Sequence, residues 1–301
     1  METINYTVII PNKNQPFLLQ RCINSIPERK DIQIIVVDDN SDPNIIDFKN
    51  YPGNTRKNVE VVYTKEGKGA GYARNVGMSH AKGKWLLFAD SDDFYNQEAF
   101  DELSKYVNSS TDVIYFNVNS VDTNTLKPSN RDKNFQKYID LYLDGKDKNG
   151  DNIKFRKWEP WNKMIRREFI KAHNITFDEI PRCNDMIFSL LVSFYAKHIE
   201  VTDSKIYCVT TNPQSITKTK IKKNVFWHCI ICEMKKNYIY GLIHHKFWQS
   251  KYIFLTICLL KNNGLFETLS FYWMIIRKRR ELQHTLKNFK LKLQNHNEKH
   301  I

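Results

Sequence analysis

The sequence has no apolar run long enough to cross a membrane and no recognisable export signal. Its aromatic-rich apolar runs, residues 252–260 and 264–276, fall short of the roughly 20 residues that a spanning helix needs. The first residues, METINYTVIIPNKN, lack the basic start and the long apolar stretch of a signal peptide. We therefore expect a cytoplasmic protein.

Common nucleotide-binding and zinc-binding motifs are also missing. Trp85 follows Gly83-Lys84 where a P-loop needs Ser or Thr, and Tyr72 replaces the third glycine of a dinucleotide fingerprint. The pair Cys229-x-x-Cys232 has no second Cys-x-x-Cys or His-x3-His at the spacing of a zinc site. We interpret these two cysteines as reduced thiols in the core of the protein.

Negative charge is scarce in the C-terminal third of the chain. Residues 205–301 hold 18 Lys and Arg against 4 Asp and Glu, a balance of +14, whereas residues 1–204 balance to −1. Clustered basic residues attract polyphosphates, nucleic acids and anionic lipid surfaces by the same long-range field. Composition alone predicts an anionic partner without choosing among them.

The apolar runs of the N-terminal part predict an open α/β sheet. They read as strands over residues 7–10, 33–37, 59–63, 85–89 and 112–121. Their apolar residues are continuous rather than alternating, which is typical of parallel strands covered on both faces. Helical spacing between strands, over residues 18–26 and 71–81, places helices on those faces.

The remainder of the chain reads mostly as helix. We expect the polar stretch 122–151 to form a mobile loop or lid, and residues 156–174 and 185–198 to be helical. The chain then divides into an α/β domain, residues 1–217, and a basic, aromatic-rich helical region, residues 218–301. The apolar run that ends at Ile276 meets four basic residues, which suits a helix on an anionic membrane surface. A helical appendage packed on the core is the alternative.

Acidic residues follow two of the predicted strands, at the edge where ligands bind in such sheets. Asp90, Asp92 and Asp93 come directly after residues 85–89. Carboxylates this close repel one another unless a cation neutralises them, and they can hold a hard divalent cation open to phosphate oxygens. Asp93 as a helix N-cap is the alternative. We favour the metal site.

Two further groups lie near the same edge. Asp38 and Asp39 end the second strand, where a carboxylate can accept from a pyrimidine N–H or a ribose hydroxyl, although Asp also begins turns. Arg74 lies early in the helix that follows the glycine-rich segment 67–71. This position can direct its donors toward a diphosphate or a carboxylate.

With these motifs, residues 5 to about 217 resemble family-2 glycosyltransferases of the GT-A fold. TVIIPNKN is similar to the opening P-x-Y-N element, IIVVDDNSD to D-D-x-S, and GAGYARNVGMSHAKGKWLLFADSDD to the A-R-N-x-G…A-x-G…D-x-D-D signature. The segments W-x-P-W-N-K-M-I-R-R-E-F-I and ITFDEIPRCNDMIF resemble the acceptor-side half. Two positions depart from the pattern: Lys13 replaces the usual aromatic residue, and Asn184 stands where many members have Glu.

The resemblance implies inverting transfer of a sugar from a nucleotide diphosphate, most often UDP, to an acceptor hydroxyl. It implies a Mg²⁺ or Mn²⁺ ion on Asp90 and Asp92, and Asp185 as the catalytic base. The donor-binding residues that it implies are Pro11, Asn14, Asp38, Asp39, Arg74 and Asp90. A sugar or lipid-linked sugar in bacterial surface polysaccharide assembly is the implied acceptor. Trp158 and Trp161 are candidates to stack on it, or are core anchors.

Two other function classes stay open on the residues alone. Mg²⁺-dependent phosphoacceptor signalling domains also carry an acidic pair after one strand and an Asp after a later one, but the intervening signature and the extra strand before Asp38 fit them badly. A basic membrane- or nucleic-acid-binding adaptor explains the charge of residues 205–301 but not the acidic strand ends. Nucleic acid is therefore not the partner that we expect.

Overall fold

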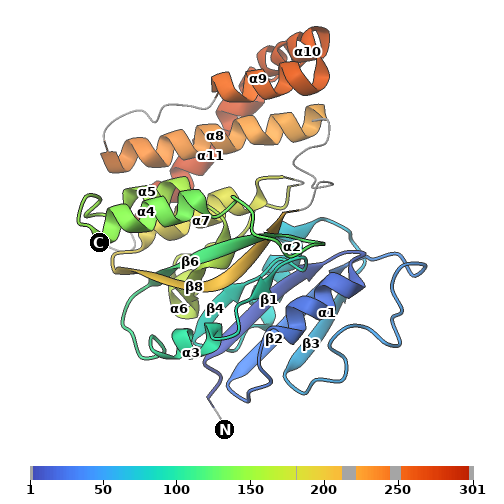
Figure 1. Ribbon diagram of the computed structural model, residues 1–301. Helices are drawn as coiled ribbons and strands as arrows, with labels where there is room; N and C mark the ends of the chain where they lie inside the picture. Colours follow the sequence, from blue (N-terminus) through green and yellow to red (C-terminus); the bar gives the residue numbers. More distant parts are fainter. Residues whose placement is uncertain (1–2, 181, 212–221, 245–251, 298–301) are drawn as a thin grey trace.

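The computed structural model describes residues 3–180, 182–211, 222–244 and 252–297, and it shows a twisted sheet flanked by helices (Figure 1). The sheet has the strand order β3-β2-β1-β4-β7-β6-β8-β5. Its strands are β1 (Tyr6–Asn12), β2 (Ile32–Asp39), β3 (Val59–Thr64), β4 (Trp85–Phe88), β5 (Phe94–Tyr95), β6 (Val113–Asp122), β7 (Lys163–Arg166) and β8 (Ile199–Thr211). Strands β1 to β4 run parallel, as do β6 and β8, while β7 is antiparallel to both of its neighbours. The predicted open, mostly parallel α/β sheet is confirmed.

The central strands form because their β-branched runs are covered on both faces. Every residue of β1 and β2 is buried. Helix α2 (Ala70–His80) packs on both strands. The contact is close: a Cβ on Gly77 would lie 2.4 Å from Ile9 Cγ2, so only glycine fits there. Helix α1 (Pro16–Asn24) lies between β1 and β2 in the sequence.

Two predictions for the middle of the chain are wrong. The stretch 122–151 is not a free loop, because it contains helix α4 (Lys133–Leu143), which buries Phe135 and Ile139, four residues apart, against the sheet. Residues 156–174 are not one helical segment, because strand β7 lies inside them. The other helices of this half are α3 (Ala99–Ser104), α5 (Asp151–Arg156), α6 (Arg167–Ala172), α7 (Asn184–Tyr195) and the short 3₁₀ turn η1 (Pro160–Asn162).

The C-terminal part is helical, as predicted: α8 (Lys223–His244), α9 (Tyr252–Asn263), α10 (Leu265–Arg277) and α11 (Arg279–Asn297). Helix α8 contacts α7 and α11, and Ile239 and Leu293 join the main core. Helices α9 and α10 pack on α8 through a second small core and lie farther from the sheet (Figure 1). The predicted boundary at residues 217 and 218 lies outside the described residues. Among the described residues, no helix combines the length and apolar character needed to cross a bilayer.

Two of the cysteines lie where these helices meet the α/β part. Cys232 is buried in the main core, as predicted, whereas Cys229 is only half-buried. The Cys229 Sγ lies 3.9 Å from the Sγ of Cys183, the residue that precedes α7. Helix α8 therefore packs directly against the start of α7.

Candidate functional site

The sheet brings the predicted site residues to one edge. Strands β1, β2 and β4 are parallel neighbours, and Asn12 at the end of β1 pairs with Asp38 at the end of β2. The loop after β4 carries the acidic motif, and α2 contacts α7, which carries Asp185. Segments that are far apart in the sequence therefore meet at the carboxyl ends of these strands.

The carboxylate of Asp38 is fully engaged with the protein. Its Oδ1 accepts from the Ser41 N–H at 2.8 Å, and its Oδ2 accepts from the Ser41 and Tyr51 hydroxyls at 2.7 Å each. Asn12 Nδ2 adds a long contact of 3.5 Å. Burial and the neighbouring Asp38 raise the pKa of Tyr51, so its hydroxyl stays a donor. Asp38 therefore orders the loop after β2 and has little capacity left for a ligand.

Asp39, its neighbour, has acceptor capacity to spare. Its side chain is buried, and Oδ2 accepts from the Gly69 N–H at 2.8 Å and lies 3.7 Å from Lys13 Nζ. Oδ1 is buried without a hydrogen-bond partner in the described part of the chain. Because an unpartnered buried oxygen is costly, this atom points to a ligand that donates to it.

Pro11 lies in β1, and Asn14 lies in the loop that follows it. Pro11 is buried in β1 and pairs with Val37 of β2. Asn14 adopts φ 58°, its N–H donates to Ser41 Oγ at 2.9 Å, and its Oδ1 accepts from the Asp42 N–H at 2.7 Å. Asn14 therefore joins the loops after β1 and β2, and its contacts are with the protein.

Arg74 connects the loop after β4 with the start of α7. Its buried guanidinium donates from Nη2 to Asp90 Oδ1 at 2.6 Å and from Nη1 to Asn184 Oδ1 at 2.9 Å. The close approach of α2 to the chain before α7 requires Gly71, because a Cβ there would lie 2.2 Å from the Asp178 carbonyl oxygen. The residue that departs from the family pattern, Asn184, is thus a direct partner of Arg74.

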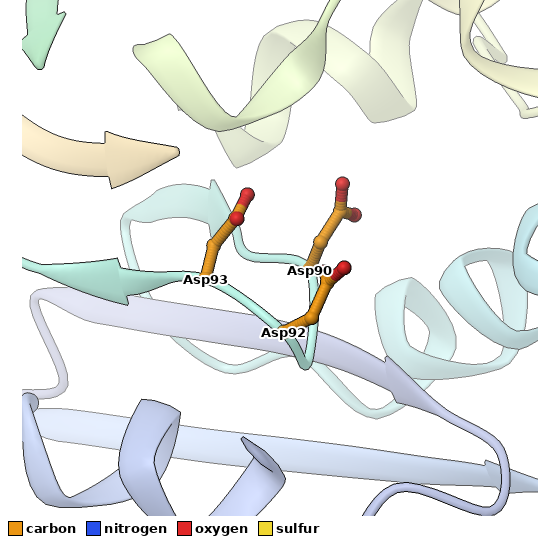
Figure 2. Close-up of side chains that lie close together, drawn as sticks. All are labelled: Asp90, Asp92 and Asp93. Carbon is orange, nitrogen blue, oxygen red and sulfur yellow. The ribbon is translucent and has the colours of Figure 1, made fainter. Parts of the chain in front are cut away.

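The acidic motif gathers three carboxylates on one side of its loop (Figure 2). One oxygen from each of Asp90, Asp92 and Asp93 lies within 4.8 Å of the others. Asp93 is buried and accepts from the Tyr207 hydroxyl at 3.1 Å and from the Thr210 N–H at 2.6 Å. Burial first, then the adjacent carboxylates, raise the pKa values of Asp92 and Asp93.

This donor set fits a hard divalent cation. Carboxylate oxygens are the ligands that Mg²⁺ and Mn²⁺ prefer, and the mutual repulsion of the cluster is relieved by a positive charge. Both oxygens of Asp93 accept from Tyr207 and Thr210, whereas Asp90 uses only Oδ1 for Arg74, so Asp92 and the other oxygen of Asp90 are suited to bind the ion. These are the two residues that the sequence interpretation named. Tyr207, whose hydroxyl also accepts from the Asp90 N–H at 2.9 Å, fixes the loop.

Asp185 is the second residue of α7, so it is not the N-cap, a position that Cys183 occupies. Burial raises the pKa of Asp185 to about 6, the Arg74 charge opposes this rise, and Glu159 and Asp90 add to it. The Asp185 carboxyl therefore belongs to the same charge cluster as the acidic motif. A carboxylate with this pKa is ionised at neutral pH and is a stronger base than an ordinary Asp.

The two candidate acceptor tryptophans have different surroundings. Trp161 is buried, with its ring stacked on Tyr207 (centroids 5.3 Å apart, planes at 11°) and tilted against Phe135. Its ring faces are not available to a sugar, so we assign Trp161 to the core and correct the acceptor role. Trp158 is half-buried, and Lys236 of α8 lies over its ring at 5.1 Å.

Lys163 is a residue that sequence reasoning missed, although it stands in the quoted W-N-K segment. It is completely buried, and its Nζ donates to the carbonyl oxygens of Lys157 and Glu159 and to Asn162 Oδ1. Burial lowers the pKa of Lys163 to about 7, against the opposing charges of Glu159 and Asp185. Lys163 therefore fixes the turn that carries Trp158 and Glu159 next to Asp185.

Residues 7–173 match the family described as Glycosyl transferase family 2. The chain belongs to this family. It is 26% identical over 222 residues to the uncharacterized glycosyltransferase EpsJ of Bacillus subtilis, covering 72% of this chain and 64% of EpsJ. It is 24% identical over 215 residues to the poly(ribitol-phosphate) beta-N-acetylglucosaminyltransferase TarS of Staphylococcus aureus, covering 69% of this chain and 36% of TarS. This chain therefore spans less than two thirds of the length of these relatives.

Solved structures share the fold of this chain. The crystal structure of S. aureus TarS 1-349 in complex with UDP-GlcNAc matches with a TM-score of 0.62 and 18% identity, over 96% of this chain and 81% of that one. The complex of the same protein with UDP gives a TM-score of 0.58 and 19% identity, over 85% and 70% of the two chains. The fold class predicted from the sequence is confirmed.

Proposed function

We propose that this protein is an inverting glycosyltransferase that moves a sugar from a nucleotide diphosphate to an acceptor hydroxyl. The observation that carries the proposal is the convergence of three groups at one sheet edge. Asp90 and Asp92 form a carboxylate pair suited to a divalent ion. Arg74 donates both to Asp90 and to Asn184, the first residue of α7. The next residue of α7, Asp185, has a raised pKa. These are the parts needed to bind a diphosphate and to deprotonate an acceptor.

The donor that we propose is a UDP-sugar. The unpartnered Oδ1 of Asp39 is suited to accept from the N–H of a uracil base or from a ribose hydroxyl. Pro11 and Asp38 would frame the nucleoside, and Asn14 joins the loops that follow β1 and β2. The structures of TarS in complex with UDP and with UDP-GlcNAc support a UDP-sugar as the donor, because this chain shares their fold.

Asp90 and Asp92 would bind Mg²⁺ or Mn²⁺. When bound, the ion neutralises the diphosphate and makes it a better leaving group. Arg74 adds donors at the same place, and its ion pair with Asp90 aligns one of the two carboxylates. No acid is then needed to protonate the leaving group, so a single base is sufficient.

Asp185 is the base in this proposal. It takes the proton of the acceptor hydroxyl while that oxygen forms its bond to the anomeric carbon and the bond to the diphosphate breaks. Glu159, whose Oε2 is buried without a partner in the described part of the chain, raises the pKa of Asp185 and so its basicity. Trp158 lies in the same turn and is the remaining aromatic candidate for contact with the acceptor.

The acceptor that we propose is a sugar or a lipid-linked sugar of a bacterial surface polysaccharide, modified in the cytoplasm. The name of one relative supports this class, since TarS is a poly(ribitol-phosphate) beta-N-acetylglucosaminyltransferase. Nucleic acid is not proposed as a partner.

A nucleotide-release assay tests the function. The purified protein is incubated with a panel of UDP-, GDP- and dTDP-sugars, with and without Mn²⁺, and free nucleotide diphosphate is measured. We expect release from a UDP-sugar that depends on the metal and increases with a suitable acceptor. Binding of UDP without turnover of any sugar nucleotide, across an acceptor panel, would contradict the enzyme and favour a binding protein.

A further inference from the structure

Helix α10 exposes an apolar face of unusual size for a surface helix. Its exposed large apolar residues are Leu265, Phe266, Leu269, Trp273 and Ile276. At about 100° per residue these five fall within an arc of about 100° on one side of the helix. The opposite side, with Thr268 and Phe271, is buried against the second small core. The helix is therefore already anchored, and its apolar face is additional to that packing.

Helix α9, which packs on α10, also exposes apolar side chains, and both helices lie at the periphery of the molecule. Ile257 and Leu260 of α9 are also exposed. Helices α9 and α10 form the layer on the far side of α8 from the sheet (Figure 1). Exposed apolar residues gathered on one arc of a helix, as on α10, mark a site of interaction, because soluble proteins otherwise keep such patches small.

Basic residues border the face at its C-terminal end. Arg277 lies over the ring of Trp273, with Cζ 4.3 Å from the ring centroid. Arg279 and Arg280 follow at the start of α11 and are exposed, while Lys278 pairs with Glu281 at 3.1 Å. The face therefore combines exposed apolar side chains with exposed positive charge at its rim. Both lie within residues 205–301, whose charge balance is +14.

We propose that the α9–α10 face is a docking surface for an anionic lipid bilayer, with α10 lying in the plane of the interface. Thirteen residues are too few to span the roughly 30 Å apolar layer but suit a helix that inserts one face. A second copy of this chain is the less suitable occupant, because Glu267, the acidic residue of α10, lies outside the apolar arc and so supplies no negative charge to the rim across a self-contact. Anionic lipid matches both features, because its acyl chains accommodate the apolar face and its headgroups attract the basic rim.

Co-sedimentation with vesicles tests the surface without any need for turnover. The full chain is mixed with vesicles of phosphatidylcholine, or of phosphatidylcholine with one third phosphatidylglycerol, at low and high salt. We expect preferential binding to the anionic vesicles, weakened by salt. Phe266→Asp should reduce this binding by roughly tenfold or more, since it removes a large apolar group and adds a repelled charge. Replacing Arg279 with Ala should reduce it about fivefold.

The chain offers a matched control for the first variant. Phe17 of α1 is 88% exposed, as is Phe266, and it lies in the other half of the molecule. Phe17→Asp should therefore bind vesicles like the wild type. Binding of UDP, measured in the absence of lipid, should be the same in Phe266→Asp and wild type, which separates loss of attachment from loss of the proposed donor site.

Three outcomes would overturn the proposal. They are no binding to either vesicle, equal and salt-insensitive binding to both, or equal loss of binding in Phe17→Asp and Phe266→Asp. A dimer in sedimentation velocity that Phe266→Asp dissociates, without vesicle binding by the wild type, would instead assign the face to self-association.

Discussion

Replacing Asp185 with Asn should strongly reduce transfer and at the same time stabilise the protein. The pKa of Asp185 is about 6 in the folded state, against 3.8 for an ordinary Asp. Because the folded pKa is raised, ionising this carboxyl costs stability, and the cost grows as the pH rises from about 4 to about 6. A shift of about two pKa units corresponds to at most about 3 kcal/mol at pH 7 and above. The amide of the variant carries no charge at any of these pH values, so it avoids that cost.

The two effects of Asp185→Asn separate the base from a structural residue. Loss of a general base should lower turnover by roughly 10² to 10⁴ while UDP affinity changes little. Urea unfolding at several pH values should show the variant gaining stability over wild type between pH 4 and pH 7, with almost no difference at pH 4. The turnover of wild type should rise with pH through about 6.

Asp178 provides the control, because it is an acidic residue near the same helix with an ordinary role. It pairs with Lys235 of α8 at 3.1 Å. Asp178→Asn should lose that ion pair, lower stability slightly and keep most of the turnover. The reasoning would be refuted if Asp185→Asn kept near-normal turnover. Loss of stability together with loss of UDP binding would show instead that Asp185 is structural.

Three further predictions concern the acidic loop, the loop after β2 and the core. Asp92→Ala should abolish the Mn²⁺ dependence of UDP binding in calorimetry, whereas Asp101→Ala on α3 should leave it unchanged; undiminished dependence in the first variant would contradict the metal site. Tyr51→Phe should lower the free energy of unfolding by about 1–3 kcal/mol, measured with urea, because Asp38 loses a buried donor. Trp161→Ala should cost about 3–5 kcal/mol as a core substitution, and a stable variant with impaired acceptor binding would contradict our assignment.

The fold was largely predictable because the central strands of its sheet are continuous apolar runs in the sequence. Strands β1, β2 and β4 are buried on both faces, so their Val, Ile and Leu residues stand together without alternation. Strand β7 was missed because its four residues, Lys163–Arg166, have little pattern of their own and depend on pairing with β4 and β6. Helix α4 was missed although Phe135, Tyr138, Ile139 and Tyr142 stand at helical spacing, because the segments on both sides of it are strongly polar.

The candidate site was predictable by residue type but not by role. Asp38 and Asp39 are adjacent and chemically identical, and only the fold shows that one is engaged by Ser41 and Tyr51 while the other keeps an unpartnered oxygen. The hydroxyl of Tyr207 reaches the acidic loop from more than a hundred residues away in sequence. Such contacts leave no local signal, because tertiary packing alone places them.

Arg74 links the proposed donor side of the site to the proposed acceptor side. Its guanidinium is the counter-charge for Asp90, and it also lowers the pKa of Asp185, which burial raises. The Nη1 group of Arg74 donates to Asn184, which is neutral, so no second carboxylate pairs with the guanidinium at that position. A glutamate there would add a negative charge beside Asp185 and raise its pKa further. The asparagine therefore favours an Asp185 that is ionised at neutral pH, which is the protonation state that a base requires.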